Sequence, residues 1–109
     1  MQIRYLETSS LGLRWMKQYY KKHSQLNKTK AFASYHQTLS LLKSQPYSGR
    51  QFDDAEGVRE ISILGTAFSI LYALKDETIF IIDIRDGRGL RSAEAIHAFN
   101  AKLREKYGL

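Results

Sequence analysis

The amino-acid sequence predicts an α+β fold in which an N-terminal strand and an antiparallel helical hairpin pack on a twisted antiparallel β-sheet. Apolar residues in the first half recur every three or four positions, as on helices. Residues 58–85 contain three apolar segments separated by short polar or glycine turns, which is typical of consecutive antiparallel strands. The 109 residues, 43% of them hydrophobic, suffice for one core. We therefore expect a single domain, residues 1–109, with the order β-α-α-β-β-β-α.

The first half should contain a short strand and two helices. Residues 1–6 alternate, with Ile3 and Tyr5 on one face, and residues 8–10 supply possible helix N-caps. Asn27 is placed to cap the second helix, and Pro46 should end it. The apolar positions of the first helix are Leu11, Trp15 and Tyr19, with Leu13, Met16 and Tyr20 beside them, and those of the second are Phe32, Tyr35, Leu39 and Leu42. These stripes form a helical hairpin with one apolar side.

The sheet should bury one face under this hairpin. In the middle strand Phe68, Ile70 and Tyr72 share a bulky face, and the reverse face is mostly small. The third segment places Phe80, Ile82 and Ile84 on one side and Ile79, Ile81 and Asp83 on the other, which suits a central strand. We expect the hairpin stripes to cover the bulky face and Trp15 to be mostly buried.

The segment after the third strand combines glycines with cations. Arg85, Arg88 and Arg91 lie within seven residues. Guanidinium groups bind phosphate or carboxylate, so this turn is either an anion cradle or a solvated loop. Ser92 should cap a final helix, which Gly108 should end. The stripe of that helix is Ile96, Phe99, Leu103 and Tyr107.

The net charge of +6 is unevenly distributed. Residues 1–50 contain nine Lys or Arg and one acid, a charge of +8, whereas residues 51–109 carry −2. Arg14, Lys17 and Lys21 occupy the polar side of the first helix. This asymmetry fits an electrostatic contact with nucleic acid or an acidic protein, and it also fits a solvated helical surface.

Several classes of protein are excluded. There is no cysteine, so disulfide and thiol chemistry are absent. No signal region and no apolar run of about 18 residues occurs, so we expect a cytoplasmic protein without a membrane partner. His23, His36 and His97 have no ligand partners at metal-site spacing. We expect no metal and no cofactor.

Short motifs along nearly the whole chain resemble the RelE/ParE superfamily, the toxins of bacterial type II toxin-antitoxin modules. They are P-x-x-G-R at positions 46–50, V-R-E-I at 58–61, F-S-I-L-Y at 68–72, and I-F-I-I-D-I-R at 79–85 followed by G-R-G. The resemblance implies a cognate antitoxin protein and an oligomeric toxin-antitoxin complex. It also implies one of two targets, because RelE-like members cut messenger RNA on the ribosome and ParE-like members inhibit DNA gyrase without hydrolysis.

The positions that carry cations in RelE differ in this sequence. Glu60, Ser62 and Ser69 stand at the matching strand positions, and the later arginine and tyrosine fall at Gly89 and Ala95. Without those cations, a charge building on phosphate lacks its usual stabilisation. The resemblance therefore favours a ParE-like gyrase inhibitor with no catalytic residue.

Two other functions stay open on the sequence. One is a ribosome-dependent messenger RNA endoribonuclease that uses Arg59, Arg85, Arg88 and Arg91 in an unusual arrangement; the other is a relative that retains antitoxin binding and has lost toxicity. The candidate residues for binding the target or the antitoxin are Arg14, Lys17, Lys21, Arg50, Arg59, Arg85, Arg88 and Arg91.

Overall fold

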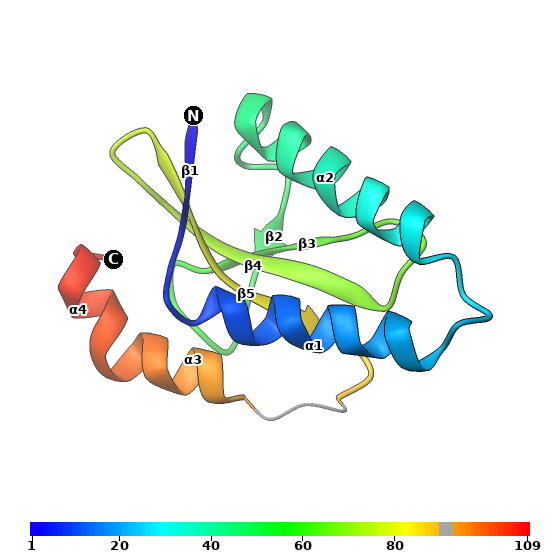
Figure 1. Cartoon of the computed structure of the whole chain (residues 1–109). Coiled ribbons are helices and arrows are strands. Elements are labelled where there is room, and N and C mark those ends of the chain that lie inside the picture. Colours follow the sequence, from blue (N-terminus) through cyan, green and yellow to red (C-terminus); the bar gives the residue numbers. More distant parts are fainter. Residues whose placement is uncertain (90–92) are drawn as a thin grey trace.

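The computed structural model describes residues 1–89 and 93–109 and confirms the α+β fold and the order of its elements (Figure 1). The elements are β1 (Gln2–Tyr5), α1 (Ser9–Lys22), α2 (Lys28–Ser44), β2 (Arg50–Gln51), β3 (Arg59–Ser62), β4 (Phe68–Lys75), β5 (Thr78–Asp86), α3 (Glu94–Ala98), the π-helical turn η1 (Phe99–Leu103) and α4 (Arg104–Tyr107). The last three form one continuous C-terminal helix. None of the described helices is long and apolar enough to cross a membrane.

The predicted helix boundaries are partly confirmed. The Asn27 side chain caps α2 by accepting from the Lys30 amide, and Gly108 ends the last helix at φ 70°. The Thr8 side chain does not cap α1; its hydroxyl donates to the Ile82 carbonyl at 2.6 Å and so ties the helix start to the sheet. The predicted cap Ser92 lies outside the described residues, and α3 begins without a side-chain cap.

The sheet has five strands in the order β1-β5-β4-β3-β2. Neighbours are antiparallel except β1 and β5, which run parallel, and the short edge strand β2 was not predicted. Leu71 pairs with Asp83 and Tyr72 with Ile81, so Ile82 is an extra residue in β5. Such a bulge reverses the alternation of side chains beyond it. The predicted grouping of Ile84 with Phe80 and Ile82 is therefore wrong.

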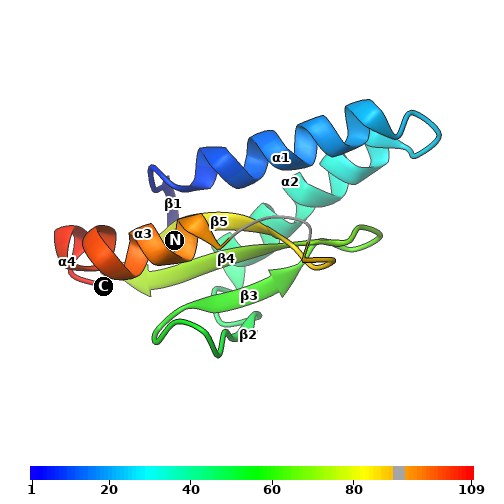
Figure 2. The same ribbon diagram turned by 90° about the horizontal axis from the view of Figure 1, so that it is seen from below.

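The helical hairpin covers the bulky face of the sheet, as predicted (Figure 2). Phe68, Ile70 and Tyr72 belong to this hairpin cluster. The buried residues of the cluster are Met16, Tyr20, Ala31, Tyr35, Leu39, Leu42, Ile63, Phe68, Ile70, Tyr72, Ile79, Ile81 and Ile84. Trp15 is partly buried at its margin. The expectation for Leu11 is wrong, because this side chain is 39% exposed.

The C-terminal helix covers one end of the opposite face. Its residues Ile96, Phe99 and Leu103 join Leu71 and Ala73 in a second cluster. The full C-terminal cluster of buried residues is Leu6, Ala55, Val58, Leu71, Ala73, Phe80, Ile82, Ile96, Phe99 and Leu103. The small side chain of Ala73 lets the helix lie close to the strands. The far end of this face, beyond Leu71, is polar and forms a candidate site.

The edge of β5 is shared between β1 and α1. Strand β1 pairs only with Thr78–Ile81, and α1 lies along the part that follows. Gly12 of α1 packs directly on the β5 backbone, since a Cβ atom at this position would lie 2.5 Å from both the amide N and the carbonyl O of Ile84. The absence of a side chain at Gly12 therefore sets how closely α1 approaches the sheet.

Candidate functional site

The polar end of the sheet is organised around a buried carboxylate. Glu60 is 6% exposed and accepts hydrogen bonds from Arg50 at 3.0 Å, Arg85 at 3.0 Å and Ser69 at 2.6 Å. These four residues, the Glu60 cluster, come from β2, β3, β4 and β5. The Tyr72 hydroxyl fixes the approach to β2 by donating to the Pro46 carbonyl at 2.8 Å and accepting from the Gly49 amide at 2.9 Å.

Electrostatics keep Glu60 ionised. Burial acts to raise the pKa of its carboxyl, but the hydrogen bonds from Ser69 and Arg50 and the charge of Arg85 outweigh burial and lower that pKa. The carboxylate therefore partly neutralises two arginines whose side chains are 80% and 43% exposed. The cluster offers less positive charge to an incoming phosphate than its two guanidinium groups suggest.

Two cavities adjoin the Glu60 cluster, and both are rich in acids. One of about 260 Å³ is lined by Arg50, Gln51, Phe52, Asp53, Asp54, Glu60 and Arg85. The other, of about 460 Å³, is lined by Phe52, Asp54, Leu71, Asp83, Arg85, Asp86, Gly89, Ala93, Ile96, His97 and Asn100. His97 was not predicted to lie near Arg85, because the packing of the C-terminal helix brings it there. No group of His and acidic side chains in the described part of the chain is arranged to hold a metal ion.

Arg88 is tied into the fold. Its backbone N–H and its guanidinium Nε and Nη2 donate to Asp86 at 3.0, 2.9 and 2.8 Å. Asp86 is 4% exposed and also accepts from Trp15 Nε1 at 2.8 Å. The guanidinium lies 3.8 Å from the centroid of the Tyr19 ring. This Asp86–Arg88 joint fastens the turn after β5 to α1.

The candidate arginines do not form one site. Arg50 and Arg85 meet at Glu60, but Arg59 faces away from them, donating to the Gly49 carbonyl at 2.7 Å and stacking on Tyr47 at 5.0 Å. Arg88 is held at α1 in the Asp86–Arg88 joint. The remaining candidate, Arg91, lies outside the described residues.

The predicted cations of α1 line a groove between α1 and α2. Arg14, Lys17 and Lys21 share one face because they are three and four residues apart. The groove, of about 260 Å³, is lined by Arg14, Lys17, Gln18, Lys21, Lys28 and Phe32, and we call it the basic groove. Lys28, at the start of α2, was not predicted to join this group.

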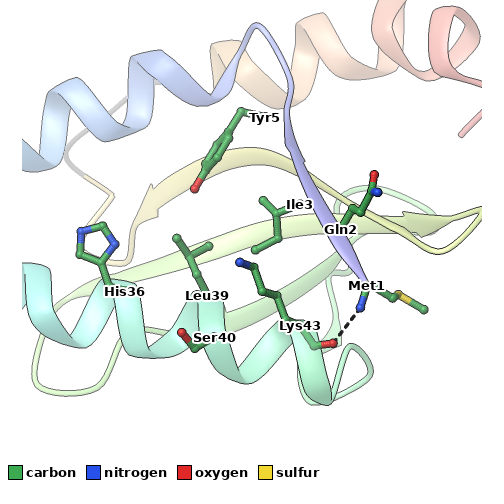
Figure 3. Close-up of a pocket in the computed structure, with 8 residues that line it drawn as sticks. All are labelled: Met1, Gln2, Ile3, Tyr5, His36, Leu39, Ser40 and Lys43. Atoms are coloured by element: carbon green, nitrogen blue, oxygen red, sulfur yellow. Dashed lines mark hydrogen bonds between the residues drawn. The ribbon is translucent and has the colours of Figure 1, made fainter.

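Two further grooves were not predicted. The β1–α2 groove, of about 640 Å³, lies between the edge strand and α2 (Figure 3). It is lined by Met1, Gln2, Ile3, Tyr5, His36, Leu39, Ser40 and Lys43, and the Met1 amino group donates to the Lys43 carbonyl at 3.0 Å. A hairpin-tip groove of about 770 Å³ includes Leu26 and Leu64, which are 39% and 80% exposed. Two exposed leucines in one groove resemble the apolar anchors of protein interfaces.

The chain is similar in fold to a protein of known structure. No protein-family model matches the chain, and no curated protein is similar to it. Among solved structures, the chain is similar to a chain of the chromosomal ParDE TA system from P. aeruginosa, with a TM-score of 0.62 and 19% sequence identity. The alignment covers 79% of this chain and 95% of that chain. The protein therefore has the fold of a chain of the ParDE toxin-antitoxin system.

Proposed function

We propose that this protein is the toxin component of a type II toxin-antitoxin system and a ParE-like inhibitor of DNA gyrase that hydrolyses nothing. A cognate antitoxin would hold it inactive in the cytoplasm as an oligomeric complex. The shared fold with the ParDE chain and the resemblance of its motifs to RelE/ParE toxins support the toxin assignment.

The observation that carries the choice of mechanism is the position of Glu60. Cleavage of a phosphodiester needs cations that are available to stabilise charge developing on the phosphate. Here a buried carboxylate stands at the polar end of the sheet and holds Arg50 and Arg85. Asp54 and Asp83 line the adjoining cavity. This arrangement repels a phosphate and favours binding without chemistry.

The antitoxin would bind at the β1–α2 groove. Strand β1 is an edge of the sheet, so one side of its backbone is available to pair with an extended segment of a partner. The exposed side chains of Met1 and Tyr5 offer apolar contacts beside it. The +8 charge of residues 1–50 favours an acidic partner segment whose association slows as salt rises.

The contact with gyrase would use the hairpin-tip groove. Leu64 is the most exposed of the large hydrophobic residues in the described chain, at 80%, and Leu26 lines the same groove. Exposed apolar side chains that gather in one depression are typical anchors for a protein partner. Gyrase would therefore contact a different surface from the β1–α2 groove, where the antitoxin would bind.

One observation favours a second candidate, the endoribonuclease. His97 and Arg85 line the same cavity, and a histidine with an arginine could supply proton transfer and charge stabilisation for RNA cleavage. The acids of that cavity and the pairing of Arg85 with Glu60 oppose this function. An activity test separates the two candidates.

Purified protein is compared in a gyrase supercoiling assay and in a translation reaction scored for messenger RNA cleavage. We expect inhibition of supercoiling and no cleavage. Leu64→Asp should weaken inhibition by about 30-fold, the effect of an interface anchor worth about 2 kcal/mol. Leu41→Asp, a matched control on the exposed surface of α2, should change inhibition less than threefold.

His97→Ala and Arg85→Ala should leave inhibition within about tenfold of the parent, because no chemical step depends on them. Cleavage of messenger RNA by the parent, lost in His97→Ala while ribosome binding persists, would replace the gyrase proposal with the endoribonuclease. The loss of one transition-state contact typically costs ~10²-fold or more in rate, so the two patterns are easily separated.

A further inference from the structure

We propose that the basic groove binds the phosphate backbone of duplex DNA, so that the protein contacts DNA and gyrase together. Its biological setting rests on the proposed gyrase inhibition, whereas the DNA contact is inferred from the groove itself. The groove is lined by residues of α1 and α2, and none of them lines the β1–α2 groove.

The charge of the basic groove is not compensated. The sequence contains no Asp or Glu between Thr8 and Phe52. Within residues 1–89 and 93–109, the ion pairs join other cations, including Arg50, Arg85 and Arg88, and none involves a cation of the groove. Like charges on one helix face destabilise it slightly. An anionic ligand would be attracted by these charges and would relieve the repulsion between them.

The lining of the groove favours nucleic acid over an acidic protein. None of the exposed large hydrophobic side chains found in the described chain lines it, so a protein partner would lack an apolar anchor. Phe32 is partly buried and packs against the hairpin cluster. Phosphate binding needs cations alone.

The same lining favours a duplex over a single strand. Single-stranded nucleic acid is usually held by exposed aromatic faces on which its bases stack, and the one aromatic residue in the groove, Phe32, is committed to the core. Arg14 and Lys21 are seven residues apart on α1, which corresponds to about 10 Å of helix axis. A row of this length faces several phosphates, since duplex DNA carries a charge about every 1.7 Å.

The number of cations sets the expected salt dependence. If the four cations each neutralise one phosphate, the slope of log K against log salt is roughly −3.6. The affinity for a short duplex should therefore fall roughly 100-fold between 50 and 200 mM salt. The base sequence of the duplex should have little effect on the affinity, because contacts to phosphates carry no sequence information.

The test is fluorescence anisotropy of a labelled 20-base-pair duplex with the full chain and two double variants. Lys17→Gln with Lys21→Gln removes two groove charges and retains good helix formers. It should reduce the salt slope by about two and weaken binding at 50 mM salt on the order of 100-fold. Lys75→Gln with Lys102→Gln removes the same charge at two exposed positions outside the grooves described above, and its binding should stay within about threefold of the parent.

Several outcomes would overturn the inference. Equal effects of the two double variants would assign binding to net charge. Tighter binding of a single strand, of duplex RNA or of a poly-glutamate peptide than of duplex DNA would assign the groove to that ligand. Gyrase inhibition by a protein that does not bind DNA would remove this inference and keep the proposed function. DNA binding without gyrase inhibition would remove the proposed function and keep the DNA contact.

Discussion

Replacing Gly12 with Ala should lower the free energy of unfolding by about 3 kcal/mol, the upper part of the range for overpacked sites. The same change in an exposed helix raises stability by about 1 kcal/mol, because Ala is the better helix former. The sign reverses here because the added methyl would lie 2.5 Å from the backbone N and O of Ile84. A strand backbone cannot rotate away as a flexible side chain can, so α1 must move.

Thermal unfolding measures this effect. A loss of 3 kcal/mol corresponds to a fall of roughly 12 °C or more in Tm for a domain of this size. Ser10→Ala, on the exposed side of the same helix, is the matched control and should leave Tm within a few degrees. An unchanged or higher Tm for Gly12→Ala would show that α1 does not lie against β5 as described.

The second large effect is expected for Asp86→Asn, which should cost about 3 kcal/mol. The substitution keeps the size of the side chain but removes its charge, leaving Arg88 among aromatic rings without a counter-ion. It also replaces one of the two carboxylate oxygens by an NH2 group. Both oxygens accept hydrogen bonds from Arg88 or Trp15, whereas an NH2 group can only donate. Breaking a buried ion pair from one side typically costs ~3–5 kcal/mol.

The control is Asp53→Asn, an exposed carboxylate that should change stability by less than about 0.5 kcal/mol. Denaturant unfolding of both variants at neutral pH gives the difference directly. Equal stabilities of the two variants would mean that the Asp86–Arg88 joint contributes nothing to the folded state.

The pH dependence follows from the same joint. Burial raises the pKa of Asp86, but hydrogen bonds from Arg88 and Trp15 outweigh burial and lower it below its ordinary value of 3.8. A group with a lowered pKa in the folded state stabilises above its unfolded pKa and loses that effect as pH falls through the folded pKa. The parent should therefore lose stability below about pH 4, and Asp86→Asn should show a shallower loss.

Much of the fold could be predicted from the sequence because apolar spacing records which residues are buried. The spacing identified the two helices of the hairpin, the strands β1, β3, β4 and β5, and the bulky face around Phe68 and Ile70. It did not fix the rotation of α1, since two adjacent apolar stripes were possible. The close approach at Gly12 selects the one that contains Met16 and Tyr20 and leaves Leu11 exposed.

The candidate site was less predictable because it depends on one irregularity. Regular alternation would place Arg85 on the face of Ile79 and Ile81, away from Glu60. The extra residue Ile82 reverses the alternation and brings Arg85 to Glu60. The sequence carries no mark of this bulge. The cations of α1 were identified correctly as one face, because regular helical spacing continues through them.

The two hydrophobic clusters described above predict two tiers of protection in hydrogen exchange. Strands β4 and β5 supply side chains to both clusters, so their amides should exchange only when the whole domain unfolds. The C-terminal helix contributes to one cluster alone, and its amides should exchange through local opening at a lower free energy. Such an opening would bare Leu71 and Ala73 while the hairpin cluster stays closed, giving this small domain a second, partly open state.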